Sequence, residues 1–175
     1  MKERVTHTFL FPQIEDVRLL KGRNRRLFHE WKRLEERLSD RKDISYVITR
    51  LNAQGLPVQY HITYGIRSIC GVEKIERLDE PGVDNGPLFA SEFKMQIDIP
   101  EDYPCMDAFP SFCFLTETAD GREIPHPWHP NIRYFGDFAG RVCLNAPDSF
   151  MDIVWFVERI ALYLKYDLYH AIQEP

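Results

Sequence analysis

The stretch FKMQIDIPEDYP, residues 93–104, has the most regular hydrophobic pattern in the chain. Its apolar side chains alternate with polar ones from Phe93 to Ile99. A period of two predicts a half-buried strand, which is typical of an antiparallel sheet. Pro100 and Pro104 then end the strand and hold the following chain extended, because proline has no N–H to donate to a sheet.

Two further strands are predicted before this one. Residues 44–51 are rich in β-branched and apolar side chains, and residues 52–55, Asn-Ala-Gln-Gly, are typical of a hairpin turn. Residues 60–66 alternate again between apolar and polar side chains. The segment 78–87 is rich in Asp, Gly and Pro, and it predicts a loop that leads to the strand at 93–99. These strands therefore predict an antiparallel meander.

A helix is predicted ahead of the meander, over residues 24–39. Its apolar residues are spaced as one stripe, at Leu27, Trp31, Leu34 and Leu38. The preceding residues 1–20 form an N-terminal extension in which Pro12 follows the apolar run 9–11. This pattern indicates an edge strand or a docked extension.

A short strand around residues 112–115 and a long segment without periodicity, residues 124–145, follow the meander. Long ordered loops in a compact domain are usually functional. A second helix is predicted over residues 150–172, with Ser149 and Asp152 as its capping box. The order helix, antiparallel strands, helix predicts an α+β fold, with one domain at residues 21–175 behind the extension.

The second predicted helix has two apolar faces. One face contains Ile153, Val157, Ile160, Leu164 and Leu168, and the other contains Trp155, Leu162, Tyr166 and Tyr169. Leaving the second face in water would forfeit several kcal/mol of burial, at about 1.5–3 kcal/mol for each large side chain. Two candidates could cover this second face: the apolar residues 9–11 of the extension, or a partner such as a second copy of the chain. The second candidate predicts self-association through this helix.

Charge is distributed unevenly. The total is −5, yet residues 18–42 carry ten basic and four acidic side chains, a local net charge of +6 that leaves −11 on the rest. The negative total does not favour nucleic acid as a partner, and the asymmetry indicates a protein-binding face for an acidic partner. The residues expected to make it are Arg25, Arg26, Lys32 and Arg33. The alternative is an ordinary solvated helix face.

The four cysteines, Cys70, Cys105, Cys113 and Cys143, form no closely spaced pair. No secretory leader and no apolar run near the roughly 18 residues of a membrane span are present. The sequence therefore predicts a cytoplasmic protein with free thiols and no membrane partner.

Three motifs follow one another around the long loop. They are the proline-rich segment from Ile99 to Pro110, then His129-Pro130-Asn131, and then, after a turn with Gly136 and Gly140, Val142-Cys143-Leu144. In this order they resemble the ubiquitin-conjugating enzyme family, whose members have a tyrosine-proline, a further proline, His-Pro-Asn, a glycine turn and an apolar-Cys-Leu segment. The resemblance covers roughly residues 23–172.

The resemblance implies a ubiquitin-conjugating-type fold with an N-terminal helix, a meander sheet, a long active-site loop and a central C-terminal helix. It implies that Cys143 carries a ubiquitin-like protein as a thioester. The modifier would come from an activating enzyme by transthiolation and pass to an amine of an acceptor protein. A thiolate suits this work because it is both a good nucleophile and a good leaving group.

The resemblance also implies roles around the thiol. Asn131 is expected to donate to the oxyanion or to brace the loop, and His129 and Pro130 are expected to support that loop. No cofactor and no metal are expected.

Three features depart from the family. Asn131 and Cys143 are twelve positions apart, which exceeds the usual spacing and predicts a lengthened loop around residues 133–138. Arg133 occupies the position of a family tyrosine, and Tyr134 is displaced by one. The usual last two helices and a downstream acidic or serine gate are absent from the pattern, so Asp137, Asp148 or Asp152 would have to replace the gate. Compact members of this kind resemble enzymes of bacterial operons associated with antiphage defence.

Other chemistry is compatible with the same residues. Cys143 could be an inert core residue, since free cysteine is often buried. His126, His129 and Cys143 could bind zinc or form a Cys–His hydrolase, although no fourth ligand and no orienting carboxylate or amide stand out. A further alternative is a non-catalytic module of the same fold that only binds a ubiquitin-like protein.

Overall fold

The computed structural model describes residues 9–105, 107–144 and 151–167, and within these ranges it shows an α+β fold. The predicted fold class is confirmed at this level. The helices are η1 (Val17–Leu19), α1 (Gly22–Leu38), η2 (Ile75–Arg77) and α2 (Ile153–Leu164). The strands are β1 (Ile44–Leu51), β2 (Pro57–Tyr64), β3 (Ser68–Val72), β4 (Pro87–Ala90), β5 (Phe93–Asp98) and β6 (Ser111–Phe114).

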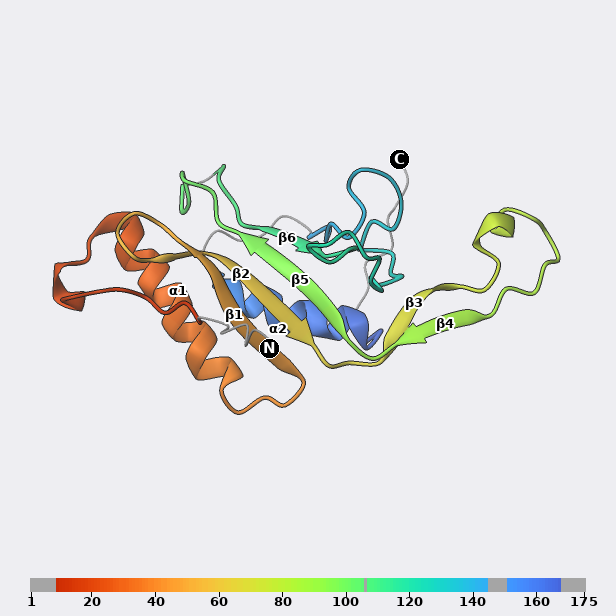
Figure 1. Ribbon diagram of the computed structural model, residues 1–175, viewed down its shortest axis with the longest axis horizontal. Coiled ribbons are helices and arrows are strands. Elements are labelled where there is room, and N and C mark those ends of the chain that lie inside the picture. Colours follow the sequence, from red (N-terminus) through yellow and green to blue (C-terminus); the bar gives the residue numbers. More distant parts are fainter. Residues whose placement is uncertain (1–8, 106, 145–150, 168–175) are drawn as a thin grey trace, which may run out of the picture.

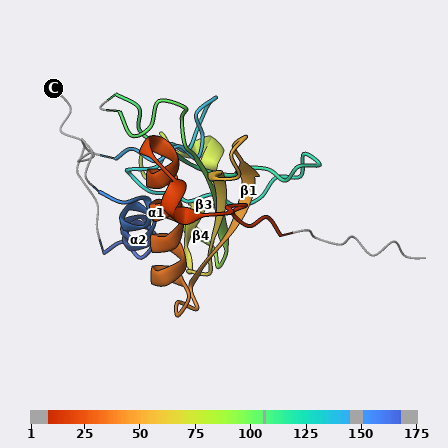
Figure 2. The same ribbon diagram turned by 90° about the vertical axis from the view of Figure 1, so that its left-hand side faces the viewer.

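The main sheet is antiparallel throughout, in the order β1-β2-β5-β6 (Figure 1). Its strands match the predicted meander, including the turn at residues 52–55. The alternation in β5 buries Phe93, Met95 and Ile97 on one face and leaves polar side chains on the other. Figure 2 shows α1 and α2 side by side on the buried face. The Tyr64 hydroxyl on β2 donates to the Val157 carbonyl at 2.9 Å, which joins the sheet to α2.

An antiparallel pair, β3 and β4, lies between β2 and β5 in sequence and forms a separate two-stranded sheet. It extends away from the main sheet as an arm (Figure 1). The sequence predicted a loop at residues 78–87 but neither of these strands. They are short, and the register shifts between Ile69 and Gly71, so no alternation of period two is present to reveal them.

Helix α1 matches its prediction within two residues, but its buried stripe differs. Trp31 is only half-buried, whereas Glu30 is 1% exposed. The Glu30 carboxylate accepts from Arg26 at 2.7 Å, from the Tyr103 hydroxyl at 2.6 Å and from the backbone N–H of Ile153 at 2.8 Å. A residue of α1 therefore caps the start of α2.

The predicted bounds of the C-terminal helix are wrong. Asp152 is the N-cap of α2 and its side chain makes no capping hydrogen bond, while Ser149 lies outside the described residues. Lys165 ends the helix, and Tyr166 follows with a positive φ of 57°, a conformation that cannot continue an α-helix. Leu168 and Tyr169 also lie outside the described residues.

The described part of the extension does not cover the second face of α2. Leu10 pairs with Ile48 on β1, and the Gln13 N–H donates to the Gly55 carbonyl at 3.0 Å. The extension is thus docked along β1. A docked extension was one of the two predictions for this segment, the other being an edge strand. On α2, Trp155 and Leu162 remain 38% and 41% exposed, and self-association through this face stays a prediction.

Candidate active site

A small antiparallel hairpin brings Asn131 and Cys143 together. The Cys143 N–H donates to the Asn131 carbonyl at 2.7 Å, and the Arg133 N–H donates to the Arg141 carbonyl at 2.9 Å. Ile132 lies opposite Val142 between these two bonds. The twelve-residue spacing is therefore closed by backbone pairing, and the extra residues form the tip of the hairpin, residues 134–140.

The hairpin docks on β6 through its second strand. The Val142 N–H donates to the Phe112 carbonyl at 2.9 Å, and the Phe114 N–H donates to the Gly140 carbonyl at 2.8 Å. Gly140 has a φ of +88°, and a Cβ there would lie 2.0 Å from the Phe114 oxygen. Only glycine fits this approach.

His129 and Asn131 lie at the base of the hairpin, 5% and 3% exposed. The Asn131 N–H donates to Nδ1 of His129 at 3.0 Å, so Nδ1 carries no proton. The His129 ring stacks on Tyr163 with centroids 5.1 Å apart and lies at the same distance from Tyr166. These contacts fit the supporting role that was predicted for His129.

Tyr166 does not belong to the outer face of α2, where the sequence placed it. Its ring contacts His129, and its hydroxyl donates to the Trp128 carbonyl. The positive φ of Tyr166 turns the chain after α2 so that the ring meets the loop, a change of direction that helical periodicity could not predict.

The remaining predicted supports differ in their positions. Pro130 is exposed beside the two buried residues. Asp137 lies at the tip of the hairpin, whereas Cys143 lies at its base. Asp148 lies outside the described residues.

A contact between the hairpin and the arm was missed by the sequence analysis. The Tyr134 hydroxyl donates to the Cys70 carbonyl on β3 at 2.7 Å, and the Trp128 N–H donates to the Ile69 carbonyl at 2.8 Å. Tyr134 also stacks on His126 with centroids 4.3 Å apart. Burial raises the pKa of Tyr134. The sequence signal that could have revealed this contact was the displacement of the tyrosine by one position from the family pattern. Tyr134 is half-buried against β3, while Arg133 is exposed.

The four thiols differ in exposure. Cys70 and Cys113 are half-buried, and burial raises the pKa of both thiols, which disfavours their nucleophilic thiolates. Cys105 and Cys143 are exposed. The alternative of Cys143 as a buried, inert core residue is therefore wrong.

The histidines give little support to zinc or hydrolase chemistry. His126 bonds through Nε2 to the Tyr134 carbonyl at 3.1 Å, and no hydrogen bond joins either histidine to Cys143 within the described ranges. No three His, Cys, Asp or Glu side chains of the described residues are grouped to hold a metal ion.

The predicted partner-binding residues on α1 have different surroundings. Arg25 is exposed, while Arg26 forms its 2.7 Å ion pair with buried Glu30. Arg33 pairs with Asp152 at 2.9 Å, and the Lys32 ammonium lies 5.5 Å from the Trp31 ring centroid. A partner-binding role for this surface stays a prediction.

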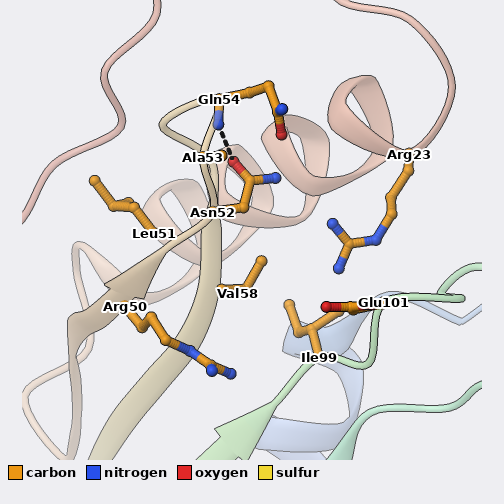
Figure 3. A pocket seen from close by; sticks show the side chains of 9 residues that line it. All are labelled: Arg23, Arg50, Leu51, Asn52, Ala53, Gln54, Val58, Ile99 and Glu101. Atoms are coloured by element: carbon orange, nitrogen blue, oxygen red, sulfur yellow. Dashed lines mark hydrogen bonds between the residues drawn. The ribbon is translucent and has the colours of Figure 1, made fainter.

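A separate pocket lies between the start of α1, the β1–β2 turn and the segment after β5. Figure 3 shows Arg23 and Arg50 entering it from different sides, with Glu101 also at its wall. Arg23 donates to the Pro100 carbonyl at 3.0 Å, and Arg50 lies 3.8 Å from Asp98. Two arginines and one glutamate are the charged residues of its lining, which includes none of the hairpin residues.

No protein-family model matches the sequence, and no curated protein matches it. Within the part of the chain that is described, no helix combines the length and apolar character needed to cross a membrane.

Proposed function

We propose that the protein is a ubiquitin-conjugating-type enzyme of compact form, which carries a ubiquitin-like protein as a thioester on Cys143. The observation that carries this proposal is the pairing of exposed Cys143 with buried Asn131 through a 2.7 Å backbone hydrogen bond. The order of motifs in the sequence supports the same function. The proposed context is a cytoplasmic conjugation pathway, with bacterial antiviral defence as the biological setting.

The first step is thioester exchange. The Cys143 thiolate attacks the carbonyl of the thioester on the activating enzyme, and the thiolate of that enzyme leaves. The two thioesters are close in free energy, so the exchange needs a nucleophile and access more than a strong base. Exposure of Cys143 supplies the access, and His129, whose ring stacks on Tyr163, helps to hold the loop beside it.

The second step is attack by an amine of the acceptor protein. The amine nitrogen bonds to the thioester carbon and loses a proton to solvent, the carbon–sulfur bond breaks, and Cys143 leaves as a thiolate. The oxyanion formed on the way needs a hydrogen-bond donor, and the Asn131 amide is the proposed donor. Asp137, Asp148 and Asp152 stay the candidates for an acidic gate near the acceptor.

The second candidate is a binding module that holds a ubiquitin-like protein without transferring it. The exposed thiol favours the enzyme, because a module that only binds needs no nucleophile. The two functions differ in one measurement, the formation of a covalent adduct.

The test is a charging assay with a candidate ubiquitin-like protein, its activating enzyme and ATP. We expect a reductant-sensitive adduct that Cys143→Ala abolishes. Cys143→Ser should give an adduct that resists thiols and yields to alkali, because an oxyester replaces the thioester. Cys105→Ala is the matched control, since Cys105 is the other exposed thiol. Loss of charging in Cys105→Ala but not in Cys143→Ala would show that the nucleophile is misassigned. Binding without an adduct would favour the module.

A further inference from the structure

The hairpin has an inner and an outer face. Ile132 and Val142 lie opposite each other and are 3% and 8% exposed, so this cross-strand pair faces the core. Side chains alternate along a strand, and directly opposite residues share a face. Arg133 and Arg141, the next pair toward the tip, therefore lie on the outer face, as does Cys143.

The backbone positions of the two arginines lie close to that of Cys143 along this face. Arg141 and Cys143 are two residues apart on one strand, which corresponds to about 6–7 Å of backbone. The guanidinium carbons of Arg133 and Arg141 lie 5.7 Å and 5.6 Å from the ring centroid of Phe138. Cation–π contacts with one ring thus hold both charges at the same place.

Arg133 and Arg141 are both exposed. Neither Arg133 nor Arg141 forms an ion pair among the residues that the structure describes. Asp137 is the one acidic residue in the segment 133–141. Phe138 and Phe135 are 55% and 59% exposed. The outer face is thus basic and aromatic on a chain whose total charge is −5.

We propose that this basic face selects the acyl acceptor, and that the preferred acceptor is a lysine flanked by acidic side chains. The inference rests on the proposed function and names the substrate class of that same site. A carboxylate next to the lysine would pair with Arg133 and Arg141, as guanidinium groups pair with carboxylates in general. A lysine flanked by basic side chains would meet like charges on this face.

The reaction at this face begins with loss of a proton. The lysine ammonium first gives one proton to solvent, because only the neutral amine is a nucleophile. The neutral amine then attacks the Cys143 thioester carbonyl, Cys143 leaves as a thiolate, and the amine proton passes to solvent. The flanking carboxylate, paired with the arginines, anchors the acceptor while the amine attacks.

The experiment compares two acceptor peptides of equal length, each with one lysine flanked either by aspartates or by arginines. Discharge of the charged protein is followed at low ionic strength. We expect about tenfold faster discharge to the acidic peptide, a preference that weakens at high salt because exposed charges are screened. The double variant Arg133→Glu/Arg141→Glu should reverse the preference. Arg122→Glu, which changes an exposed arginine outside the hairpin, is the matched control and should keep it.

A second measurement needs no modifier. The Cys143 thiol is allowed to react with anionic 5,5′-dithiobis(2-nitrobenzoate) and with neutral 4,4′-dithiodipyridine, and labelling at Cys143 is assigned by peptide mass. The double variant should lower the anionic-to-neutral rate ratio several-fold, and Arg122→Glu should not. An unchanged ratio, or normal charging with no peptide preference, would overturn this inference alone. Failure of Cys143 to charge would overturn the proposed function as well.

Discussion

Gly140 is the single residue on which the position of the hairpin depends most directly. Its carbonyl accepts from the Phe114 N–H, and its positive φ brings its Cα against the Phe114 carbonyl. A side chain at this position would push the second strand of the hairpin off β6. Cys143 lies three residues further along that strand, so the thiol would move with it.

Gly140→Ala should therefore lower the free energy of unfolding by about 2–4 kcal/mol and impair charging. A positive φ alone costs a non-glycine residue about 1–2 kcal/mol, and the clash with Phe114 adds to it. Gly136→Ala is the control, because Gly136 has a φ of +78° but its Cβ would meet nothing within 4 Å. Urea denaturation measures both. Equal losses would show that the contact with Phe114 is unimportant.

Asn131 combines burial with a place beside the exposed thiol. As the proposed oxyanion donor, it should matter for transfer to an amine more than for thioester exchange. We expect Asn131→Ala to leave charging largely intact and to slow discharge to an amine by roughly 10²–10³-fold. Single-turnover discharge and the melting temperature are measured together. A collapse of the melting temperature with activity would make Asn131 a structural residue, and unchanged discharge would exclude both roles.

At the scale of elements, the two helices are joined by one carboxylate. Glu30 on α1 accepts from Arg26, from Tyr103 and from the first N–H of α2. Its contacts replace the side-chain cap that Asp152 does not make. The start of α2 is thus fixed by α1 and by the segment after β5.

Glu30→Ala should lower the free energy of unfolding by about 2–4 kcal/mol, because it removes a helix cap and leaves buried donors without an acceptor. Glu36→Ala changes an exposed carboxylate on the same helix and should stay within about 0.5 kcal/mol of the wild type. Chemical denaturation followed by circular dichroism measures both. Similar stability of the two variants would contradict the role given to Glu30.

At the scale of the whole molecule, the core is rich in buried tyrosines. Burial raises the pKa of Tyr60 and Tyr64 well above the ordinary value, and burial together with Glu30 raises the pKa of Tyr103. The Tyr64 hydroxyl donates to Val157, whereas the Tyr60 hydroxyl has no hydrogen-bond partner among the described residues. The folded state thus holds these phenols in their neutral form.

The sign of the resulting pH dependence follows from proton binding. Above a pH of about 10, the unfolded chain loses tyrosine protons that the folded chain keeps, so stability should fall as pH rises. Each buried tyrosine contributes a slope of up to about 1.4 kcal/mol per pH unit. Denaturation curves between pH 8 and pH 12 measure this, and Tyr60→Phe should remove one tyrosine's share of the slope. A flat profile to pH 12 would contradict the argument.

The sequence by itself determined the elements whose pattern is local. The alternation from Phe93 to Ile99 and the stripe on α1 depend on which face of one element is buried, and burial of a single face leaves a fixed period in the sequence. The candidate nucleophile, Cys143, also came from the sequence, because the order of the motifs around it can be seen along the chain and resembles that of a known family. The α+β class and the main sheet follow from these patterns.

Only the tertiary structure decided how distant segments meet. The hairpin that pairs Asn131 with Cys143, the cap from Glu30 to Ile153, and the turn at Tyr166 depend on contacts between segments far apart in the chain. The β3–β4 arm depends in the same way on pairing across a loop. Such contacts depend on strand register and on which segments come close in space, and the local hydrophobic period of a sequence contains neither. For that reason the outer face of the hairpin could be recognised only in the folded protein.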